Sequence, residues 1–423
     1  MSTAAPSHPR LLADFNPARG VLKSDFEDFV VEELPLYPAD GVGTHAYFLL
    51  EKRGLSTMQA ISDLARALGV RRMDIGLAGL KDARAVTRQW MSIEHIDPQR
   101  LEALSLPRMR VLRVTRHRNK LKLGHLRGNR FEIRVRDTEI GRLPELRAAL
   151  ETLGKLGAPN YFGEQRFGGR GDSGRVGASI VRGSLDDAVD LILGRPGPHD
   201  SGPVLRARQL YERGDFESAA RAWPPMFRDE RHALQALARS GGKRKRAFAA
   251  IDHGLRRFYV SAFQSELFNQ VVAARIRRGL GVLLDGDLAW VHANGAVFRV
   301  ASASEEQVRA ESFEISPSGP LFGFRMTQPD GEPASIEAAA LAGAELTLEA
   351  FRAPHLRVKG ARRPLRFRPL DADISLAADE RGPYLAMQFE LPRGCYATTL
   401  LRELFVNPGE ADGGELGESN ETE

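Results

Sequence analysis

The sequence has few of the residues that stabilise small secreted folds or anchor a chain in a membrane. Its 423 residues include a single cysteine, Cys395. A disulfide framework and a cysteine-based zinc site are therefore excluded. No uninterrupted apolar run approaches the ~18 residues that a membrane-spanning helix needs. The first residues also lack the apolar segment of a signal peptide. From these absences we expect a cytoplasmic protein.

The chain also lacks the common signatures of metal and nucleotide sites. Its ten histidines are scattered, and no two of them have the HxxxH spacing of a metal-binding helix. The one GxGxxG match, at residues 169–174, follows EQRFG and not the buried apolar strand that a dinucleotide-binding fold requires. We therefore expect neither cofactor nor metal, so that any catalysis uses acid–base or carboxylate chemistry.

Charge is unevenly distributed along the chain. The net charge is +5, but residues 407–423 contain six acids and no base, so residues 1–406 carry +11. A basic body suits a polyanionic partner such as RNA. The acidic tail at 407–423 contains no aromatic residue. We expect it to be disordered and dispensable, because it cannot bury enough apolar surface to fold.

The order of the expected elements indicates that one domain is inserted into another. Strands are expected early in the chain, at 28–33 and 44–51, and helices dominate the middle, at 178–250 and 255–278. Strand patterns then return after residue 364. We expect domains over 1–157 and 351–406 for the outer part and over 158–350 for the inserted part. The joint at 157–159, Gly-Ala-Pro, ends an expected helix.

Residues 108–136 form the most basic stretch, with eleven Lys or Arg residues and one acid, Glu132. Charged and apolar residues alternate here, as in Phe131, Ile133 and Val135, which predicts strands with one packed face and one charged face. The charged face is either an ordinary solvated surface or a surface that follows RNA phosphates. Both interpretations are open at this point.

The most informative stretch is residues 74–94, DIGLAGLKDARAVTRQWMSIE. It predicts a strand, a short loop that presents Asp82, and a second strand. Lys81, Arg84 and Arg88 surround this acid in the sequence, and nearby cations favour the ionised form of a carboxyl group. An ionised, positioned aspartate acts as a base or a nucleophile. The plain alternative is a surface loop with ordinary ion pairs.

Several strings, taken together, resemble the TruD family of tRNA pseudouridine synthases over roughly residues 20–406. AGLKDARAVTRQW at 78–90 resembles the catalytic motif of the family. The further strings that agree in order and spacing are Lys23 with DFVVEE at 28–33, RHRNKLKLGHLRGNRFEIRVR at 116–136, PNYFGEQRFG at 159–168, SAFQSELFNQVVAARI at 261–276, DGDLAW at 285–290 and LPRGCYATTLLRELF at 391–405. Several motifs in register are more specific than any one of them.

The resemblance implies an isomerase of tRNA processing that needs no cofactor or metal. In that family, a uridine of tRNA, typically at position 13, becomes pseudouridine. The glycosidic bond breaks, the uracil turns, and C5 is joined to the ribose. The target base lies inside a folded RNA and must be flipped out of it. The family's aspartate attacks C1′ of the ribose, takes the 2′ proton, or attacks C6 of the base, and the sequence does not distinguish these routes.

The resemblance also assigns roles to six residues of this sequence. Asp82 takes the place of the invariant catalytic aspartate, and Lys23 that of the cation paired with it. Asn129 matches a residue placed to hydrogen-bond the substrate. The aromatic candidates for stacking on the flipped base are Phe29, Phe131 and Tyr396. Tyr396 departs from the phenylalanine that is common there, and the region 178–250 looks longer than in compact members. Each substrate-binding candidate has a plain alternative as a core, turn or solvated residue.

The implied fold is α+β, with a pseudouridine-synthase-like mixed, mainly antiparallel sheet flanked by helices and an inserted α+β domain of the TruD type. We expect a monomer that binds tRNA and no membrane. Two rival functions stay open. A non-catalytic RNA-binding protein or chaperone explains the basic strands but not the Asp82 loop. A carboxylate-dependent glycoside or nucleoside hydrolase usually needs two cooperating carboxylates, and the sequence pairs no second acid with Asp82.

Overall fold

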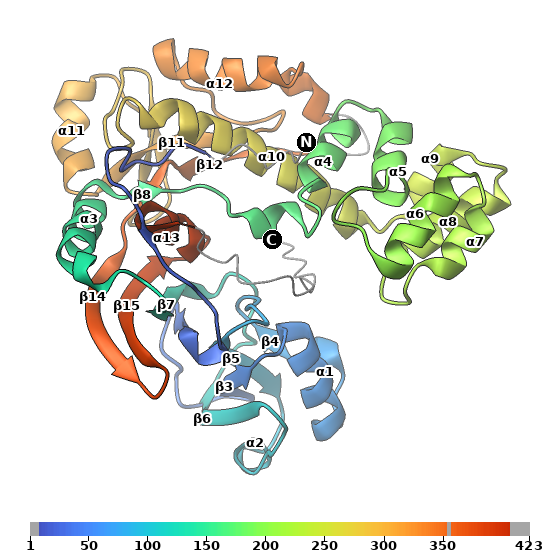
Figure 1. Ribbon diagram of the computed structural model, residues 1–423, viewed down its shortest axis with the longest axis horizontal. Coiled ribbons are helices and arrows are strands. Elements are labelled where there is room, and N and C mark those ends of the chain that lie inside the picture. The colour runs from blue at the N-terminus through green and yellow to red at the C-terminus, as the bar shows by residue number, and fades with distance from the viewer. Residues whose placement is uncertain (1–7, 353–356, 407–423) are drawn as a thin grey trace. The chain divides into compact units, whose positions relative to one another are not determined.

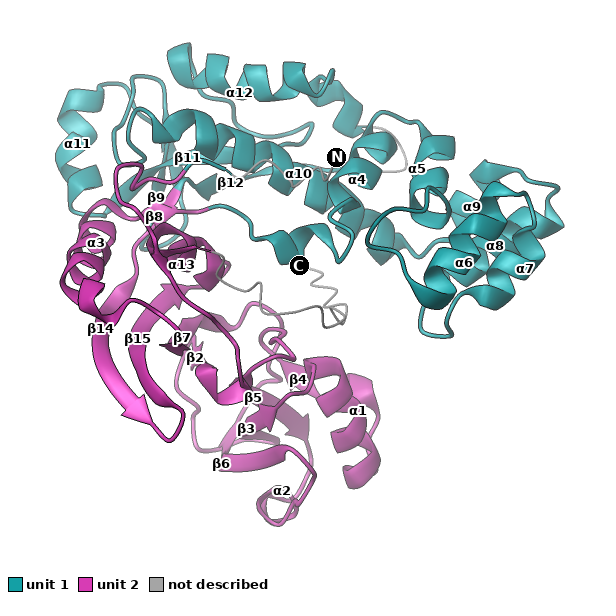
Figure 2. Ribbon diagram, viewed as in Figure 1, with its two compact units in different colours: residues 1–9, 161–365, 422 teal, residues 10–160, 366–421, 423 magenta. Residues whose placement is uncertain are grey.

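The computed structural model describes residues 8–352 and 357–406, which divide into two compact units (Figures 1 and 2). The sheet unit comprises residues 10–160 together with 366–406, and the helix-rich unit comprises 8–9 together with 161–365. The chain thus leaves the sheet unit once and returns to it. The acidic tail expected at 407–423 lies outside the described residues.

The second unit boundary differs from the position inferred from the sequence. It falls at 365/366, whereas the sequence pattern predicts 350/351. The difference arises because strand β12 (Ala361–Pro364) pairs antiparallel with β11 (Ile315–Leu321) and so stays in the helix-rich unit. The first boundary falls at 160/161, three residues beyond the expected joint.

A large sheet forms the centre of the sheet unit, with strand order β14-β15-β7-β2-β5-β3-β6 and β4 paired to β5. Its neighbouring strands are antiparallel except β2 and β5, which run parallel. The expectation of a mixed, mainly antiparallel sheet is confirmed. The strands are β2 (Phe29–Pro35), β3 (His45–Arg53), β4 (Gly76–Leu77), β5 (Val86–Glu94), β6 (Met109–His117), β7 (Leu126–Val135), β14 (Leu370–Asp379) and β15 (Gly382–Pro392).

One face of this sheet packs two separate apolar clusters. Phe29, Phe131 and Phe389 belong to the first cluster, together with residues of α3 (Leu143–Leu156) and α13 (Ala397–Leu404). Phe48 and Met91 belong to the second, together with residues of α1 (Thr57–Leu68). Every second residue of a strand points to the same face of the sheet, and these residues form the strand side of both clusters.

Helix α1 forms where its sequence pattern predicts it. Ser56 caps its N-terminus by accepting a hydrogen bond from the Gln59 amide, and Gly69 ends it in the left-handed conformation, at φ 70°. Ile61 and Leu64 lie on its buried face, which packs on the second cluster. The cap fixes where the helix begins, and Thr57, its first residue, lies behind the Asp82 loop described below.

The helix-rich unit is built around the long helix α10 (His253–Ile276), which contacts α4, α12 and β11. A four-stranded sheet with order β10-β9-β11-β12 completes it. The remaining elements are α4 (Ser173–Val181), α5 (Leu185–Leu193), α6 (Gly202–Glu212), α7 (Phe216–Ala222), α8 (Arg228–Arg239), α9 (Arg244–Ala250), β9 (Leu288–Val291), β10 (Val297–Arg299), α11 (Ala303–Glu311) and α12 (Gly331–Gly343). Within the described residues, no helix combines the length and apolarity that crossing a membrane requires.

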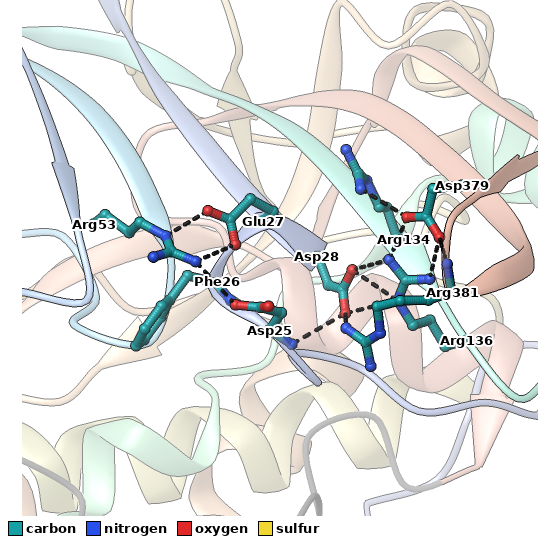
Figure 3. Close-up of polar contacts among 9 residues, drawn as sticks. All are labelled: Asp25, Phe26, Glu27, Asp28, Arg53, Arg134, Arg136, Asp379 and Arg381. Atoms are coloured by element: carbon teal, nitrogen blue, oxygen red, sulfur yellow. Dashed lines mark hydrogen bonds and ion pairs between the residues drawn. The ribbon is translucent and has the colours of Figure 1, made fainter.

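Figure 3 shows a charge network at the large sheet, of which the central pair, Asp28 and Arg136, is buried. Asp28 is completely buried and the Arg136 side chain is 7% exposed. Arg136 donates hydrogen bonds to both carboxylate oxygens of Asp28, at 2.7–2.9 Å, and to Asp379 at 2.7 and 3.0 Å. Hydrogen bonds from Arg136 hold the pKa of the Asp379 carboxyl well below its usual range. The network joins the end of β7 to the start of β2 and to the β14–β15 hairpin.

We predict that Asp28→Asn lowers the free energy of unfolding by about 3 kcal/mol, because it removes one carboxylate from a buried arginine. The matched control is Glu145→Gln, which breaks an exposed pair with Arg142 and should cost less than ~1 kcal/mol. Urea unfolding of the two variants measures the difference. Equal losses in both variants would contradict a stabilising role for the buried network.

Candidate active site

Asp82 lies on the loop between β4 and β5, and Lys23 is bound to it. The Lys23 ammonium donates to Asp82 Oδ2 at 2.9 Å, and the two side chains are 16% and 31% exposed. The same ammonium lies over the Phe29 ring, 4.3 Å from its centre. Lys23 therefore contacts both Asp82 and Phe29, and the Asp82 side chain stays partly open to solvent.

Two of the cations that neighbour Asp82 in the sequence, Lys81 and Arg88, pair with other acids. Lys81 Nζ contacts Glu33 Oε2 at 2.7 Å, and this pair is buried. Arg88 forms ion pairs with Glu32 and Glu51. Side chains alternate between the two faces of a strand, so proximity in the sequence was a poor guide to ion pairing here. Lys23, which is 59 residues away in the chain, forms an ion pair with Asp82.

The Asp82 loop is held from behind by buried polar groups that the sequence analysis did not single out. The Thr57 hydroxyl accepts a hydrogen bond from the Lys81 amide at 2.9 Å and donates to Gln89 Oε1 at 3.0 Å. Gln89 Nε2 in turn donates to the Gly79 carbonyl at 3.3 Å. The Lys52 ammonium also donates to carbonyl oxygens of this loop. These contacts fix the main chain on both sides of Asp82.

Two buried charges beside the Asp82 loop, Glu33 and Lys52, leave a signal in the sequence. In β2 the inward positions Phe29 and Val31 are followed at the same spacing by Glu33, and Glu33 is 1% exposed. In β3 the inward positions Phe48 and Leu50 are followed by Lys52, which is fully buried. A charge that continues an inward period-two pattern marks a buried polar site, and both charges here lie beside the Asp82 loop.

Phe29 and Phe131 are core residues as well as site candidates. They are 4% and 7% exposed, and their rings meet edge to face with centres 6.1 Å apart. Phe131 also stacks on Phe389, at 5.2 Å. The structure therefore joins Asp82, Lys23, Phe29 and Phe131 into one chain of contacts, whose far end lies inside the first apolar cluster.

Asn129 precedes Phe131 by two residues on β7, so its side chain lies on the same face of the sheet. It pairs directly across from Glu33. Its Oδ1 atom is buried and accepts no hydrogen bond from any described residue. Tyr396 lies at the N-terminal cap of α13 and is partly buried. An unsatisfied buried amide at a partly open site suits a ligand that supplies a donor.

The basic stretch at 108–136 is less available to a polyanion than its composition indicates. Six of its eleven cations form ion pairs within the sheet unit: Arg110, Arg118, Arg127, Arg130, Arg134 and Arg136. Across the described residues, no group of three or more His, Cys, Asp or Glu residues is arranged to hold a metal ion. The site is thus built from one carboxylate, cations, amides and aromatic rings.

This fold, with an ion-paired aspartate on a loop of a mixed sheet, defines a pseudouridine-synthase-like α+β protein. A family model described as tRNA pseudouridine synthase D (TruD) matches residues 9–404. The chain therefore belongs to the TruD family.

Named relatives and a solved structure agree with this assignment. The chain is 46% identical over 386 residues to tRNA pseudouridine synthase D of Geobacter metallireducens, covering 91% of this chain and 94% of the relative. It is 44% identical to that of Geobacter sulfurreducens, covering 94% and 97%. A crystal structure from Methanosarcina mazei, assigned as tRNA pseudouridine synthase D, superposes with a TM-score of 0.79 at 28% identity and covers 93% of this chain and 95% of that one.

We predict that Thr57→Val loosens the Asp82 loop, because valine has the shape of threonine but neither accepts from the Lys81 amide nor donates to Gln89. An unmade buried hydrogen bond costs about 1–3 kcal/mol, so amide exchange over residues 78–90 should accelerate roughly tenfold or more. Thr57→Ser retains the hydroxyl and is the matched control. Exchange measured by mass spectrometry that is unchanged in Thr57→Val would show that this hydroxyl does not hold the loop.

Proposed function

We propose that this protein isomerises a uridine of tRNA, at position 13, to pseudouridine, and that Asp82 is its catalytic residue. Membership of the TruD family over residues 9–404 supports the reaction class. The single observation that carries the residue assignment is the 2.9 Å ion pair between Lys23 and the partly exposed Asp82. An ionised carboxylate that is fixed in place and open to solvent suits attack on a flipped nucleotide.

The proposed reaction exchanges one glycosidic bond for another within the same nucleotide. The C1′–N1 bond breaks, uracil turns in the pocket, and C5 bonds to C1′; C5 then loses its proton and N1 gains one, so the product is an isomer of the substrate. Asp82 acts by attack on C1′, by removal of the 2′ proton, or by attack on C6. In each route the carboxylate must be unprotonated at the start, and the contact with Lys23 favours that form.

The residues around Asp82 are proposed to bind the flipped base. Asn129 supports this role, because its buried Oδ1 is available to accept from the uracil N3–H. Phe29 and Phe131 are more than nine-tenths buried, so we propose that they form the wall behind the base. Tyr396 is more open and is proposed as the stacking face. Base stacking on an aromatic ring contributes ~1–3 kcal/mol.

The two units are proposed to divide the work. The sheet unit, which contains every proposed site residue, is the catalytic domain, and residues 161–365 form the inserted domain. Because one chain supplies all these residues, we propose that the protein acts as a monomer. A tRNA substrate places its proposed action in the cytoplasm, and the proposed chemistry uses no metal or cofactor.

We predict that wild-type protein converts uridine 13 of unmodified tRNA transcripts and that Asp82→Asn lowers the rate by at least ~1,000-fold, as for the loss of other catalytic nucleophiles. Carbodiimide labelling followed by primer extension detects the product. The matched control is Asp74→Asn, since Asp74 lies eight residues earlier and pairs with Arg71 at the surface. The control should retain full activity.

Each other outcome of this assay contradicts a different part of the proposal. Salt-sensitive tRNA binding without conversion by the wild type would indicate a non-catalytic RNA-binding protein. Release of free uracil from the RNA would indicate a hydrolase. Full activity in Asp82→Asn would remove Asp82 from the reaction while leaving the isomerase assignment in place.

We predict that Lys23→Met lowers the rate at saturating tRNA by about 10- to 100-fold, because the pair with Asp82 is worth ~1–3 kcal/mol in a partly buried setting. Lys23→Arg restores a cation and should recover most of the rate. Single-turnover kinetics on both variants measure the effect. Equal rates in Lys23→Met and wild type would contradict a catalytic role for the ion pair.

A further inference from the structure

Lys52 is a buried cation beneath the Asp82 loop. Its side chain is completely removed from solvent. The ammonium donates to three carbonyl oxygens, of Leu55 at 2.5 Å, of Lys81 at 3.3 Å and of Asp82 itself at 3.0 Å. One contact therefore joins the residue to the turn before α1, and the other two join it to the main chain of the catalytic loop.

The strand register explains how the ammonium reaches this place. In β3, Lys52 lies opposite Thr87 of β5, and Thr87 lies opposite Val31 of β2, which itself faces Phe131 of β7. These residues form one row across a single face of the sheet. The row is apolar at Phe131 and Val31 and becomes polar at Thr87 and Lys52. Lys52 thus points to the side of the sheet on which Asp82 lies.

The charge of Lys52 does not serve the stability of the fold. Within the described residues, no carboxylate forms an ion pair with it. Removing an ammonium from water without an ion-pair partner is costly, and hydrogen bonds to carbonyl groups offset the cost only in part. An apolar side chain such as methionine fills a similar volume without burying a charge. A buried unpaired cation in contact with a catalytic loop therefore calls for a functional reason.

We infer that Lys52 is a positioning residue for the isomerisation: its charged form fixes the main chain at residues 81 and 82 and maintains a positive potential under the Asp82 carboxylate. The inference rests on the function proposed above. Lys52 has no contact with the substrate in this role. It acts through Asp82, because its hydrogen bonds to the carbonyls of Lys81 and Asp82 fix the backbone position from which the Asp82 side chain extends.

The protonation of Lys52 links this role to pH. Burial lowers its pKa from 10.5 to about 7; Asp82 raises it and Lys81 lowers it. Lys81 is itself paired with Glu33, and Asp82 with Lys23. Between pH 7 and 10.5 the unfolded chain keeps a proton that the folded chain has lost, so the fold gains stability as pH rises. The charge under Asp82 is lost over the same range.

A positioning lysine and a purely structural lysine therefore predict different results. If the charge positions Asp82, the rate falls with rising pH while stability rises. The test compares wild type, Lys52→Met, Lys52→Arg and the control Lys155→Met, whose lysine is exposed on α3. Single-turnover conversion of a tRNA transcript is measured from pH 6 to 8.5 at saturating and subsaturating enzyme. Urea unfolding of the same proteins is measured over the same range.

We expect the wild-type rate at saturating enzyme to fall with a slope approaching tenfold per pH unit above about pH 7. Lys52→Met should be about 100-fold slower at pH 6.5, because small misplacements of a reacting group cost that much. Its half-saturating enzyme concentration should stay within about threefold of wild type. Lys52→Arg remains charged at every pH tested, so it should recover much of the rate and have a flat profile. Relative to Lys52→Met, the wild type should gain stability as pH rises.

A wild-type profile that is flat from pH 6 to 8.5 overturns the inference, and this measurement needs no variant to fold. The inference is also overturned if the rate of Lys52→Arg falls above about pH 7 as the wild-type rate does. A Lys52→Met rate equal to that of Lys155→Met overturns it as well. Failure of the proposed function is distinguishable, because wild-type protein would then form no pseudouridine at any pH.

Discussion

The parallel pairing of β2 with β5 is the constraint on which the rest of the sheet unit depends. It joins an antiparallel group of strands ending at β14 to a second group ending at β6. Each group has its own apolar cluster on the same face, closed by different helices. Between the two clusters, Glu33, Thr87 and Lys52 continue the inward rows. Two of these polar residues, Glu33 and Lys52, bind the loop that carries Asp82.

The Asp82 loop is bound by groups that are themselves buried. Thr57 begins α1, Lys52 belongs to β3, and Glu33 belongs to β2, so three separate elements meet under one short segment. Leaving any of these polar groups without its hydrogen-bond partner in the interior would destabilise the fold. Opening the loop therefore exposes or unpairs several polar atoms at once. A catalytic carboxylate gains from this arrangement, since the cost of positioning it is met during folding and not during the reaction.

The sequence allowed much of this protein to be predicted, for reasons that differ from element to element. Helix α1 has a capped start, a glycine stop and a regular apolar stripe, so its position is encoded locally. The class of the sheet follows from alternating strands such as Phe131 to Val135. The helix-rich unit extends to residue 365 because β12 pairs with β11, and a pairing between strands so far apart in the chain leaves no local signal in the sequence. The cations nearest Asp82 in the sequence were poor guides for the same reason: strand alternation turns Arg88 to the other face, while Lys23 arrives from a distant segment. The sequence shows Lys52 and Glu33 as charges at strand positions whose neighbours two residues away face the core. The strand register is needed to show that both lie at the Asp82 loop.

The position of Lys23 connects the proposed active site to the charge network of Figure 3. Lys23 has a left-handed backbone, φ 57°, which is unfavourable for a residue with a side chain. The segment is fixed on both sides of it. Val21 exchanges two backbone hydrogen bonds with Arg136, at 2.8 and 3.0 Å, and the Asp25 amide donates to the Asp28 carboxylate at 3.1 Å. Arg136 and Asp28 are themselves the buried pair of the network, so the same ion pair anchors the chain before and after Lys23. The left-handed conformation of Lys23, whose ammonium contacts Asp82, is therefore maintained by a buried ion pair that involves neither Lys23 nor Asp82.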